Sequence, residues 1–151
     1  MEFIPSPNFW VGRNGYKPLA IVLHQTAGAF AGAISWLTNK TSQVSAHYVV
    51  AKDGTVVQLV ADENTAWHAG RIYNPTWKLP IENVNPNYYT IGIEHEILAN
   101  EAMTIEQFEA SARLIAALAK KFNIPLDNEH IIKHRSIYAK KTCPGNMCLG
   151  F

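Results

Sequence analysis

The chain of 151 residues has little cysteine, no long hydrophobic run and almost no excess of one charge. Two cysteines are too few for the disulfide framework of a small secreted domain. No run approaches the roughly 18 apolar residues of a membrane span, and residues 1–5 lack the basic start and apolar stretch of a secretory signal. A net charge of +1 with mixed signs indicates neither nucleic-acid binding nor a polybasic membrane surface. We therefore expect a soluble protein made in the cytosol.

The length suits one domain that spans residues 1–151, because no linker or internal repeat divides the chain. Apolar patterns predict strands at 19–24, 45–51, 55–60 and 90–98, and helices at 29–39 and 104–121. Asp53-Gly54 predicts a tight hairpin, and Thr104 with Gln107 has the spacing of a capping box. Residues before 18 are turn-rich and predict an irregular arm. These elements predict an α/β fold with a central mixed sheet packed by helices.

Three residues supply the ligand set of an open metal site. His24 ends one apolar run, His134 ends another, and Cys143 follows nine positions after His134. The end of a buried strand is a frequent place for active-site residues. Zinc prefers imidazole nitrogen and thiolate sulfur, and a site with three protein ligands leaves the fourth position for water. If these side chains converge on one Zn²⁺ ion, the protein is a hydrolase.

Cys143 and Cys148 have other interpretations. The two thiols are separated by four residues, so a disulfide across this short loop is the simplest alternative. A chain without an export signal usually keeps its thiols reduced, which argues against the disulfide. A metal ligand and an ordinary thiol without a role are then equal alternatives for Cys143. A further alternative is a cysteine hydrolase in which Cys143 is the nucleophile and His24 or His134 is the base. Cys148 is expected to have no role.

A carboxylate stands in the predicted strand at 90–98. Strand alternation puts Glu94 and Glu96 on one face, with Ile91, Ile93 and His95 on the other. An acidic solvent-facing edge is the ordinary explanation, but a carboxylate in an apolar strand needs a partner if it is buried. Water on a zinc ion would be such a partner, so we expect Glu94 to act as the general base. Glu96, His95 and His130 are expected to be structural or to lie at the surface.

Five sequence blocks, in order, resemble the zinc-dependent N-acetylmuramoyl-L-alanine amidases. This family includes phage lysozyme-like amidases, muropeptide-recycling amidases and peptidoglycan recognition proteins. The blocks are Ile21-Val22-Leu23-His24-Gln25-Thr26-Ala27-Gly28, Val44-Ser45-Ala46-His47-Tyr48-Val49-Val50, Ala66-Trp67-His68-Ala69-Gly70, Ile91-Gly92-Ile93-Glu94, and His134-Arg135 with Lys141-Thr142-Cys143-Pro144-Gly145. Any one block is weak, but five in the family order cover nearly the whole chain after residue 19.

The resemblance implies hydrolysis of the amide between N-acetylmuramic acid and L-alanine in bacterial peptidoglycan. It implies that His24, His134 and Cys143 bind Zn²⁺, that Glu94 is the catalytic carboxylate and that Lys141 is the cation near the scissile carbonyl. Cys143 replaces the aspartate of some relatives, which places the chain nearer the phage and recognition-protein branches. Where some phage members carry a tyrosine this chain has Ala46, so we do not expect a tyrosine to polarise the carbonyl.

Other residues of these blocks are candidates for contact with the substrate. We expect Thr26 and Trp67 to contact it. We also expect this of His68, because Ala69-Gly70 would let a ligand approach closely, and a surface histidine is the alternative. His47 is a further candidate for contact with the substrate, from the cleft wall, and a core residue is the alternative. For Tyr48, Trp36 and Trp77, packing in the core and stacking against a sugar are equal alternatives.

The biological role has several alternatives at this point. A recognition module that binds peptidoglycan without cleaving it would share the fold but is expected to lack the thiolate ligand. Absence of an export signal agrees with a phage endolysin, which acts on the wall after release from the host cytoplasm. It also agrees with a cytosolic muropeptide-recycling amidase. Endolysins often carry a separate wall-binding domain, so the chain is expected to be the catalytic part of a longer protein.

Overall fold

The computed structural model describes residues 1–98 and 100–145. The helices are α1 (Phe30–Leu37), α2 (Ile105–Phe122) and α3 (His134–Ile137), with 3-10 turns η1 (Lys40–Ser42) and η2 (Pro86–Tyr89). The strands are β1 (Glu2–Phe3), β2 (Phe9–Trp10), β3 (Ala20–Gln25), β4 (Tyr48–Val50), β5 (Val56–Gln58), β6 (Thr65–Ala66), β7 (Thr90–His95) and β8 (Ile131–Lys133). Cys148 lies outside the described residues. Within them, every helix is too short or too polar to cross a bilayer.

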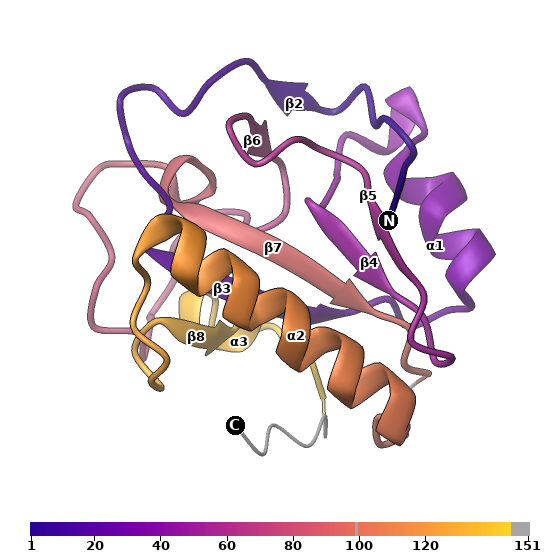
Figure 1. Cartoon of the computed structure of the whole chain (residues 1–151). Coiled ribbons are helices and arrows are strands. Elements are labelled where there is room, and N and C mark those ends of the chain that lie inside the picture. The colour runs from indigo at the N-terminus through magenta and orange to yellow at the C-terminus, as the bar shows by residue number, and fades with distance from the viewer. Residues whose placement is uncertain (99, 146–151) are drawn as a thin grey trace.

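Six strands form one mixed sheet in the order β1-β5-β4-β7-β3-β8 (Figure 1). Strands β4, β7, β3 and β8 are parallel to one another, whereas β5 is antiparallel to β4. The predicted hairpin is confirmed, because Val50 pairs with Val56 across a turn in which Gly54 has a φ of +85°. That left-handed conformation favours glycine. The predicted α/β fold with a central mixed sheet is therefore confirmed.

Helix α2 covers one face of the sheet (Figure 1). Alternate residues of the two longest strands are fully buried in the core cluster that also contains Leu118 of α2: Ile21 and Leu23 on β3, and Ile91 and Ile93 on β7. The next residue on each strand points to the opposite face, because side chains alternate along a strand. The core under α2 therefore leaves His24 and Glu94 free to face the other side of the sheet.

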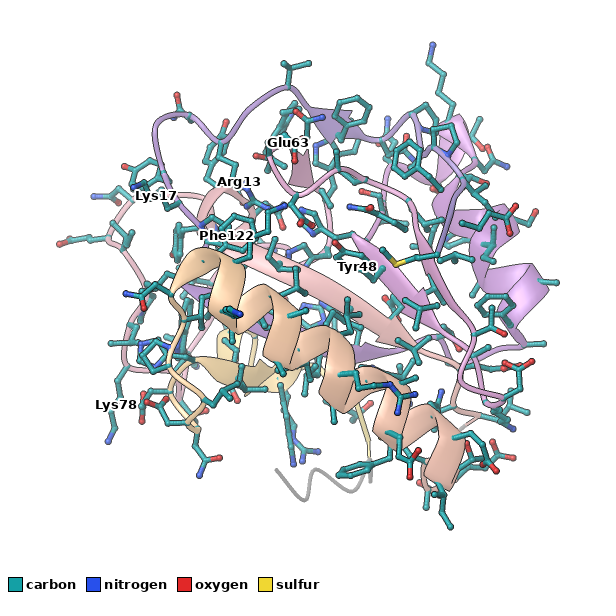
Figure 2. All side chains as sticks on the ribbon, in the orientation of Figure 1. Arg13, Lys17, Tyr48, Glu63, Lys78 and Phe122 are labelled. Atoms are coloured by element: carbon teal, nitrogen blue, oxygen red, sulfur yellow. The ribbon has the colours of Figure 1, made fainter. Side chains whose placement is uncertain are left out.

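The opposite face is covered by loops and short elements. Trp77 and Tyr89 belong to the buried cluster that contains Val22 of β3, and the centroids of their two rings are 5.9 Å apart. Tyr48, labelled in Figure 2, packs instead in the α2 core, and its hydroxyl donates a hydrogen bond of 2.5 Å to Asp62 Oδ1. Trp77 and Tyr48 are thus core residues, which resolves two of the three aromatic alternatives.

The start of α2 differs in part from the predicted capping box. The Thr104 side chain accepts a hydrogen bond of 3.1 Å from the Gln107 backbone N–H, as expected of an N-cap. The Gln107 side chain does not accept a hydrogen bond from the Thr104 backbone N–H, as a capping box requires. Its Nε2 donates instead to the carbonyls of Val50 and Glu96, because these buried acceptors lie beside it. The helix end agrees with the prediction, since Asn123 adopts the left-handed conformation directly after Phe122.

The N-terminal arm is more regular than the sequence predicts. Strand β1 pairs with β5 at the edge of the main sheet, and β2 pairs with β6 in a separate ribbon. Arg13 points from the arm into the molecule (Figure 2) and is only 7% exposed. Its guanidinium donates to the carbonyls of Asp62 and Thr90 at 2.7 and 3.1 Å. Local turn signals could not predict this arrangement, because all of its partners lie far along the chain.

Candidate active site

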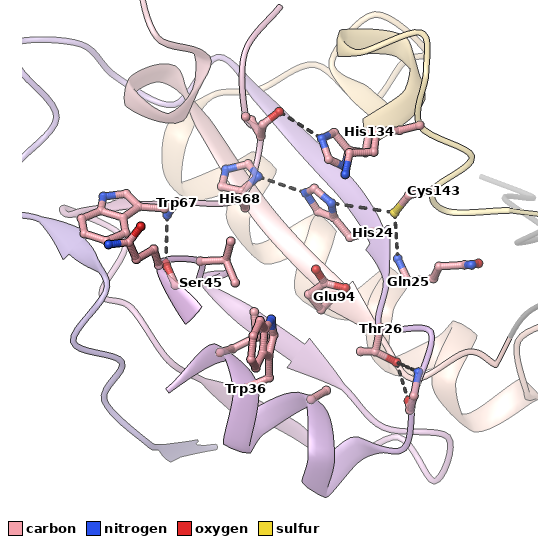
Figure 3. Close-up of a pocket in the computed structure, with 18 of the residues that line it drawn as sticks. His24, Gln25, Thr26, Trp36, Ser45, Trp67, His68, Glu94, His134 and Cys143 are labelled. Atoms are coloured by element: carbon pink, nitrogen blue, oxygen red, sulfur yellow. Dashed lines mark hydrogen bonds between the residues drawn. The ribbon is translucent and has the colours of Figure 1, made fainter. Parts of the chain in front are cut away.

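The three predicted metal ligands come together at one edge of the sheet. His24 lies near the end of β3, and His134 is the first residue after the neighbouring parallel strand β8. The carboxyl ends of parallel strands meet at the same edge, which is where α/β proteins usually bind ligands. Cys143 returns to this edge after α3. One ligand atom from each residue lies within 4.8 Å of the other two (Figure 3).

The surrounding backbone holds His134 and Cys143 in place. The Nε2–H of His134 donates to the Ala69 carbonyl at 3.0 Å, so Nδ1 carries the lone pair and is free to bind a cation. The Gln25 backbone N–H donates to Cys143 Sγ at 3.2 Å, and the sulfur lies 3.9 Å from His24 Nδ1. Arg135 holds the same loop, since its backbone N–H donates to the Cys143 carbonyl at 3.0 Å. Sequence reasoning missed this anchor, although the His134-Arg135 pair was a possible signal.

The electrostatics of the cluster suit a metal centre. Burial lowers the pKa of His24 well below its ordinary value and also lowers that of His134, so both rings are neutral at pH 7, as ligands must be. Burial, followed by the charge of Glu94, raises the pKa of the Cys143 thiol to about 12. Such a thiol is a poor nucleophile, because reactive cysteines have lowered pKa values. A divalent cation would reverse the shift and hold the thiolate. The donor set and the bare His134 Nδ1 therefore fit zinc.

Glu94 stands beside the three ligands. It pairs with His24 in the parallel register of β3 and β7, so the two side chains share one face. Desolvation raises the Glu94 pKa to about 7, and its Oε2 is buried without a hydrogen-bond partner among the described residues. A carboxylate with a pKa near neutrality and an unused acceptor is suited to exchange protons with a water or substrate in the cavity.

A cavity of about 670 Å³ opens in front of these groups. Its lining includes Thr26, Trp67, His68 and Lys141, as well as the three ligands and Glu94. The Lys141 side chain is exposed at the cavity, and its charge contributes to lowering the pKa of His24 and His134. The Thr26 hydroxyl donates to the Gly28 carbonyl at 2.6 Å and so shapes the turn after β3.

Trp36 and His47, two candidates for contact with the substrate, differ in their access to the cavity. Trp36 is 57% exposed on α1 and lines the cavity, so it is available to a ligand. His47 is fully buried and does not line the cavity. Its Nδ1 accepts a hydrogen bond of 3.0 Å from the Gly92 N–H, and its Nε2 lies 3.1 Å from the Asn64 carbonyl. Of the alternatives for His47, the structure therefore supports a core residue behind the cavity wall and not a contact for the substrate.

Other groups support the site from behind. The His95 ring bridges the His24 carbonyl at 3.0 Å and the Ser111 hydroxyl of α2 at 2.8 Å, which agrees with its predicted structural role. Glu96 accepts from the backbone N–H groups of Phe30 and Lys52 at 3.0 and 2.9 Å. It thereby holds the start of α1, which has no side-chain cap of its own, against the sheet. These contacts are not predictable from sequence because they join distant segments.

Residues 14–146 match the protein family N-acetylmuramoyl-L-alanine amidase. The chain is 39% identical over 105 residues to N-acetylmuramoyl-L-alanine amidase A of Achromobacter lyticus, covering 68% of this chain and 51% of the relative. It is 30% identical over 161 residues to the 1,6-anhydro-N-acetylmuramyl-L-alanine amidase AmpD of Salmonella typhimurium, covering 94% and 82%. The chain thus spans about half the length of the Achromobacter relative.

A solved structure carries the same fold. It is the complex of the N-acetylmuramyl-L-alanine amidase AmiD from E. coli with anhydro-N-acetylmuramic acid-L-Ala-D-gamma-Glu-L-Lys, and it superposes with a TM-score of 0.72 at 27% identity. The alignment covers 85% of this chain and 52% of that chain. Since the family match extends over most of the sequence, and the predicted ligands meet in one cavity, the chain belongs to the N-acetylmuramoyl-L-alanine amidase family.

Proposed function

We propose that the protein is a zinc-dependent hydrolase that cleaves the amide between N-acetylmuramic acid and L-alanine in bacterial peptidoglycan. One observation carries the proposal. The ligand atoms of His24, His134 and Cys143 lie within 4.8 Å of one another, beside an unpartnered Glu94 oxygen and an open cavity. Three such ligands would hold Zn²⁺ with one position open. When bound there, zinc supplies Lewis-acid chemistry: it acidifies water and polarises a carbonyl.

The chain's own residues supply the proton transfers and the binding. Glu94, with its raised pKa, takes the proton of the attacking water and passes it to the nitrogen of the leaving L-alanine. Lys141 at the cavity stabilises negative charge on the carbonyl oxygen. The exposed face of Trp36 offers an apolar platform to the substrate, and Trp67 and Thr26 contact it from other parts of the cavity wall. The contacts of Thr26 and Trp67 with the substrate are the ones predicted from the sequence.

The described residues act in this proposal as a single catalytic domain. Its proposed partner is the muropeptide, either in the intact wall or as a soluble fragment. Lysis of the wall after release from a host cytoplasm, with help from a separate wall-binding domain, is the first candidate role. Recycling of soluble fragments is the second, because the Salmonella relative named above is a 1,6-anhydro-N-acetylmuramyl-L-alanine amidase.

The decisive experiment is digestion of purified peptidoglycan, followed by mass spectrometry. We expect new L-alanine amino termini from the zinc-loaded protein, and none after treatment with a chelator. Glu94→Gln should bind zinc but form product about 10²- to 10⁴-fold more slowly. A protein that sediments with peptidoglycan and never cleaves it would instead be a recognition module. Loss of activity on thiol alkylation of the zinc-loaded protein would favour Cys143 as the nucleophile. Comparing intact walls with soluble anhydro-muropeptides separates the two roles.

A further inference from the structure

A buried imidazole stands directly behind one of the metal ligands. His68 Nδ1 lies 3.0 Å from His24 Nε2, and the two rings are perpendicular, with centroids 5.2 Å apart (Figure 3). On its far side, His68 Nε2 lies 3.1 Å from the hydroxyl oxygen of Thr90. His68 is 9% exposed, and Thr90 is fully buried. Both ring nitrogens of His68 are therefore engaged by protein atoms, which leaves no ring nitrogen for a substrate.

The direction of each hydrogen bond follows from the last group in the series. The Thr90 hydroxyl donates its only proton to the Pro86 carbonyl at 2.7 Å, so its oxygen accepts from His68 Nε2–H. A neutral imidazole carries one proton, which makes His68 Nδ1 an acceptor. His24 must then donate from Nε2–H, and its lone pair is on Nδ1, the atom that faces Cys143 Sγ at 3.9 Å. One buried hydroxyl thus sets the tautomers of two histidines.

The packing around His68 holds the ring in this orientation. Gly92 lies under it on β7, and a Cβ at that position would come within 2.4 Å of His68 Cγ. A glycine inside a strand often marks such a close approach. The backbone N–H groups of His68 and Ala69 both donate to Asn87 Oδ1, at 3.1 and 2.8 Å. Strand β7 therefore limits the position of the His68 ring, and Asn87 holds the backbone of His68.

We propose that His68 is a positioning residue for the metal ligand His24, rather than a contact for the substrate. It holds His24 in the Nε2–H tautomer, so that Nδ1 points to the position shared with His134 and Cys143. Ligating histidines commonly donate their second N–H to a carboxylate, a carbonyl or water. Here the acceptor is a second imidazole, that of His68. The tautomer of His68 depends on Thr90, and the position of its ring depends on the space above Gly92. This inference rests on the proposed metal site.

A neutral acceptor has a consequence for the charge of the centre. A carboxylate behind His24 would add a negative charge, whereas His68 adds none. Among the described residues that line the cavity, the carboxylate and the thiol that could carry negative charge beside a bound cation are Glu94 and Cys143. The series from Thr90 through His68 to His24 therefore orients the ligand without weakening the electrophilic character of the centre.

The first test needs no substitution and no metal. Long-range ¹H–¹⁵N imidazole correlations in the metal-free protein report which nitrogen of each histidine carries the proton. We expect the Nε2–H tautomer for both His24 and His68 near pH 7.5. His24 protonated on Nδ1 would overturn the proposal. This result is separate from the proposed function, which fails if the unaltered protein does not bind zinc or does not cleave peptidoglycan.

The second test compares two variants at a position that does not line the cavity. Thr90→Val removes the hydroxyl, whereas Thr90→Ser keeps it. Loss of an outer hydrogen-bond partner typically lowers metal affinity about 10- to 100-fold. We expect a loss of this size for Thr90→Val in competition titrations of zinc against a chromophoric chelator, and less than about a threefold change for Thr90→Ser by the same reasoning. Equal zinc affinity in Thr90→Val and the parent would overturn the role of the hydroxyl.

A third comparison separates positioning from substrate contact. Gly92→Ala should displace the His68 ring and weaken zinc binding, whereas Gly32→Ala on α1 should not, because a Cβ there meets nothing within 4 Å. His68→Ala should lower zinc affinity and leave the KM of the zinc-saturated protein within about twofold. A His68→Ala variant with unchanged zinc affinity and a raised KM would show that His68 contacts the substrate, and would overturn the proposal.

Discussion

Replacing Glu94 by glutamine should stabilise the metal-free protein while it removes catalysis. The side chain keeps its shape but loses its charge. Desolvation raises the Glu94 pKa from 4.5 to about 7, which means that the folded protein resists ionisation of this group. A group whose pKa is raised on folding contributes its full stability below the unfolded value and loses it as the pH rises through the folded value. The parent protein should therefore lose stability between about pH 4.5 and pH 7.

The size of the effect follows from the shift. A difference of one pKa unit corresponds to about 1.4 kcal/mol, so the carboxylate destabilises the folded state by about 3 kcal/mol at pH 8, about 2 kcal/mol at pH 6 and about 1 kcal/mol at pH 5. Glutamine has no such dependence. The neutral acid and the amide leave similar polar atoms without partners. The stability difference between variant and parent should therefore grow by about 2.5 kcal/mol from pH 5 to pH 8, and this growth measures the ionisation of Glu94 alone.

Urea unfolding of parent and variant in a chelator, followed by circular dichroism at pH 5, 6 and 8, measures this difference. Zinc content and peptidoglycan digestion are measured on the same samples. We expect Glu94→Gln to retain zinc and to lose about 10²- to 10⁴-fold in kcat. A constant difference in the free energy of unfolding across these pH values would refute the assignment of Glu94 as a desolvated carboxylate. Gain of stability with full activity would refute its role as the base.

Three further predictions concern the metal, the cavity and the core. Saturating zinc should stabilise the protein against thermal unfolding by about 4 kcal/mol at a free concentration 1,000 times its Kd, and a chelator that leaves Tm unchanged would contradict the metal site. Trp36→Ala, at a residue 57% exposed in the cavity wall, should raise KM with little change in stability, and an unchanged KM would show that this face is not used. Leu118→Ala, which removes a buried side chain from the α2 core, should cost about 2–5 kcal/mol in urea unfolding; a cost under about 1 kcal/mol would mean that this core collapses into the gap.

Local patterns predicted much of the fold. The apolar run before His24, the Asp53-Gly54 turn and the helical spacing over residues 104–121 each depend on neighbours in the chain. Sequence was therefore sufficient to predict β3, the hairpin and α2. The N-terminal arm is irregular over most of its length, as predicted. Its short strands β1 and β2 were not predicted, because they pair with strands more than fifty residues away. The second hydrogen bond of the capping box, from the Thr104 backbone to the Gln107 side chain, was also predicted wrongly. The Gln107 side chain donates instead to carbonyls of distant segments.

The candidate site divides in the same way. Residue chemistry and the resemblance to a family predicted His24, His134, Cys143 and Glu94 as site residues, because zinc restricts its ligands to few side-chain types. The structure brings these four residues together in one cavity. Only the tertiary structure decided that His47 is enclosed in the core while Trp36 lines the cavity. Only the structure, too, showed that the His68 ring contacts Nε2 of His24, on the side of that ring away from Cys143. A sequence lists the groups that can bind or transfer protons, but the direction of each side chain depends on contacts between segments that the sequence keeps far apart.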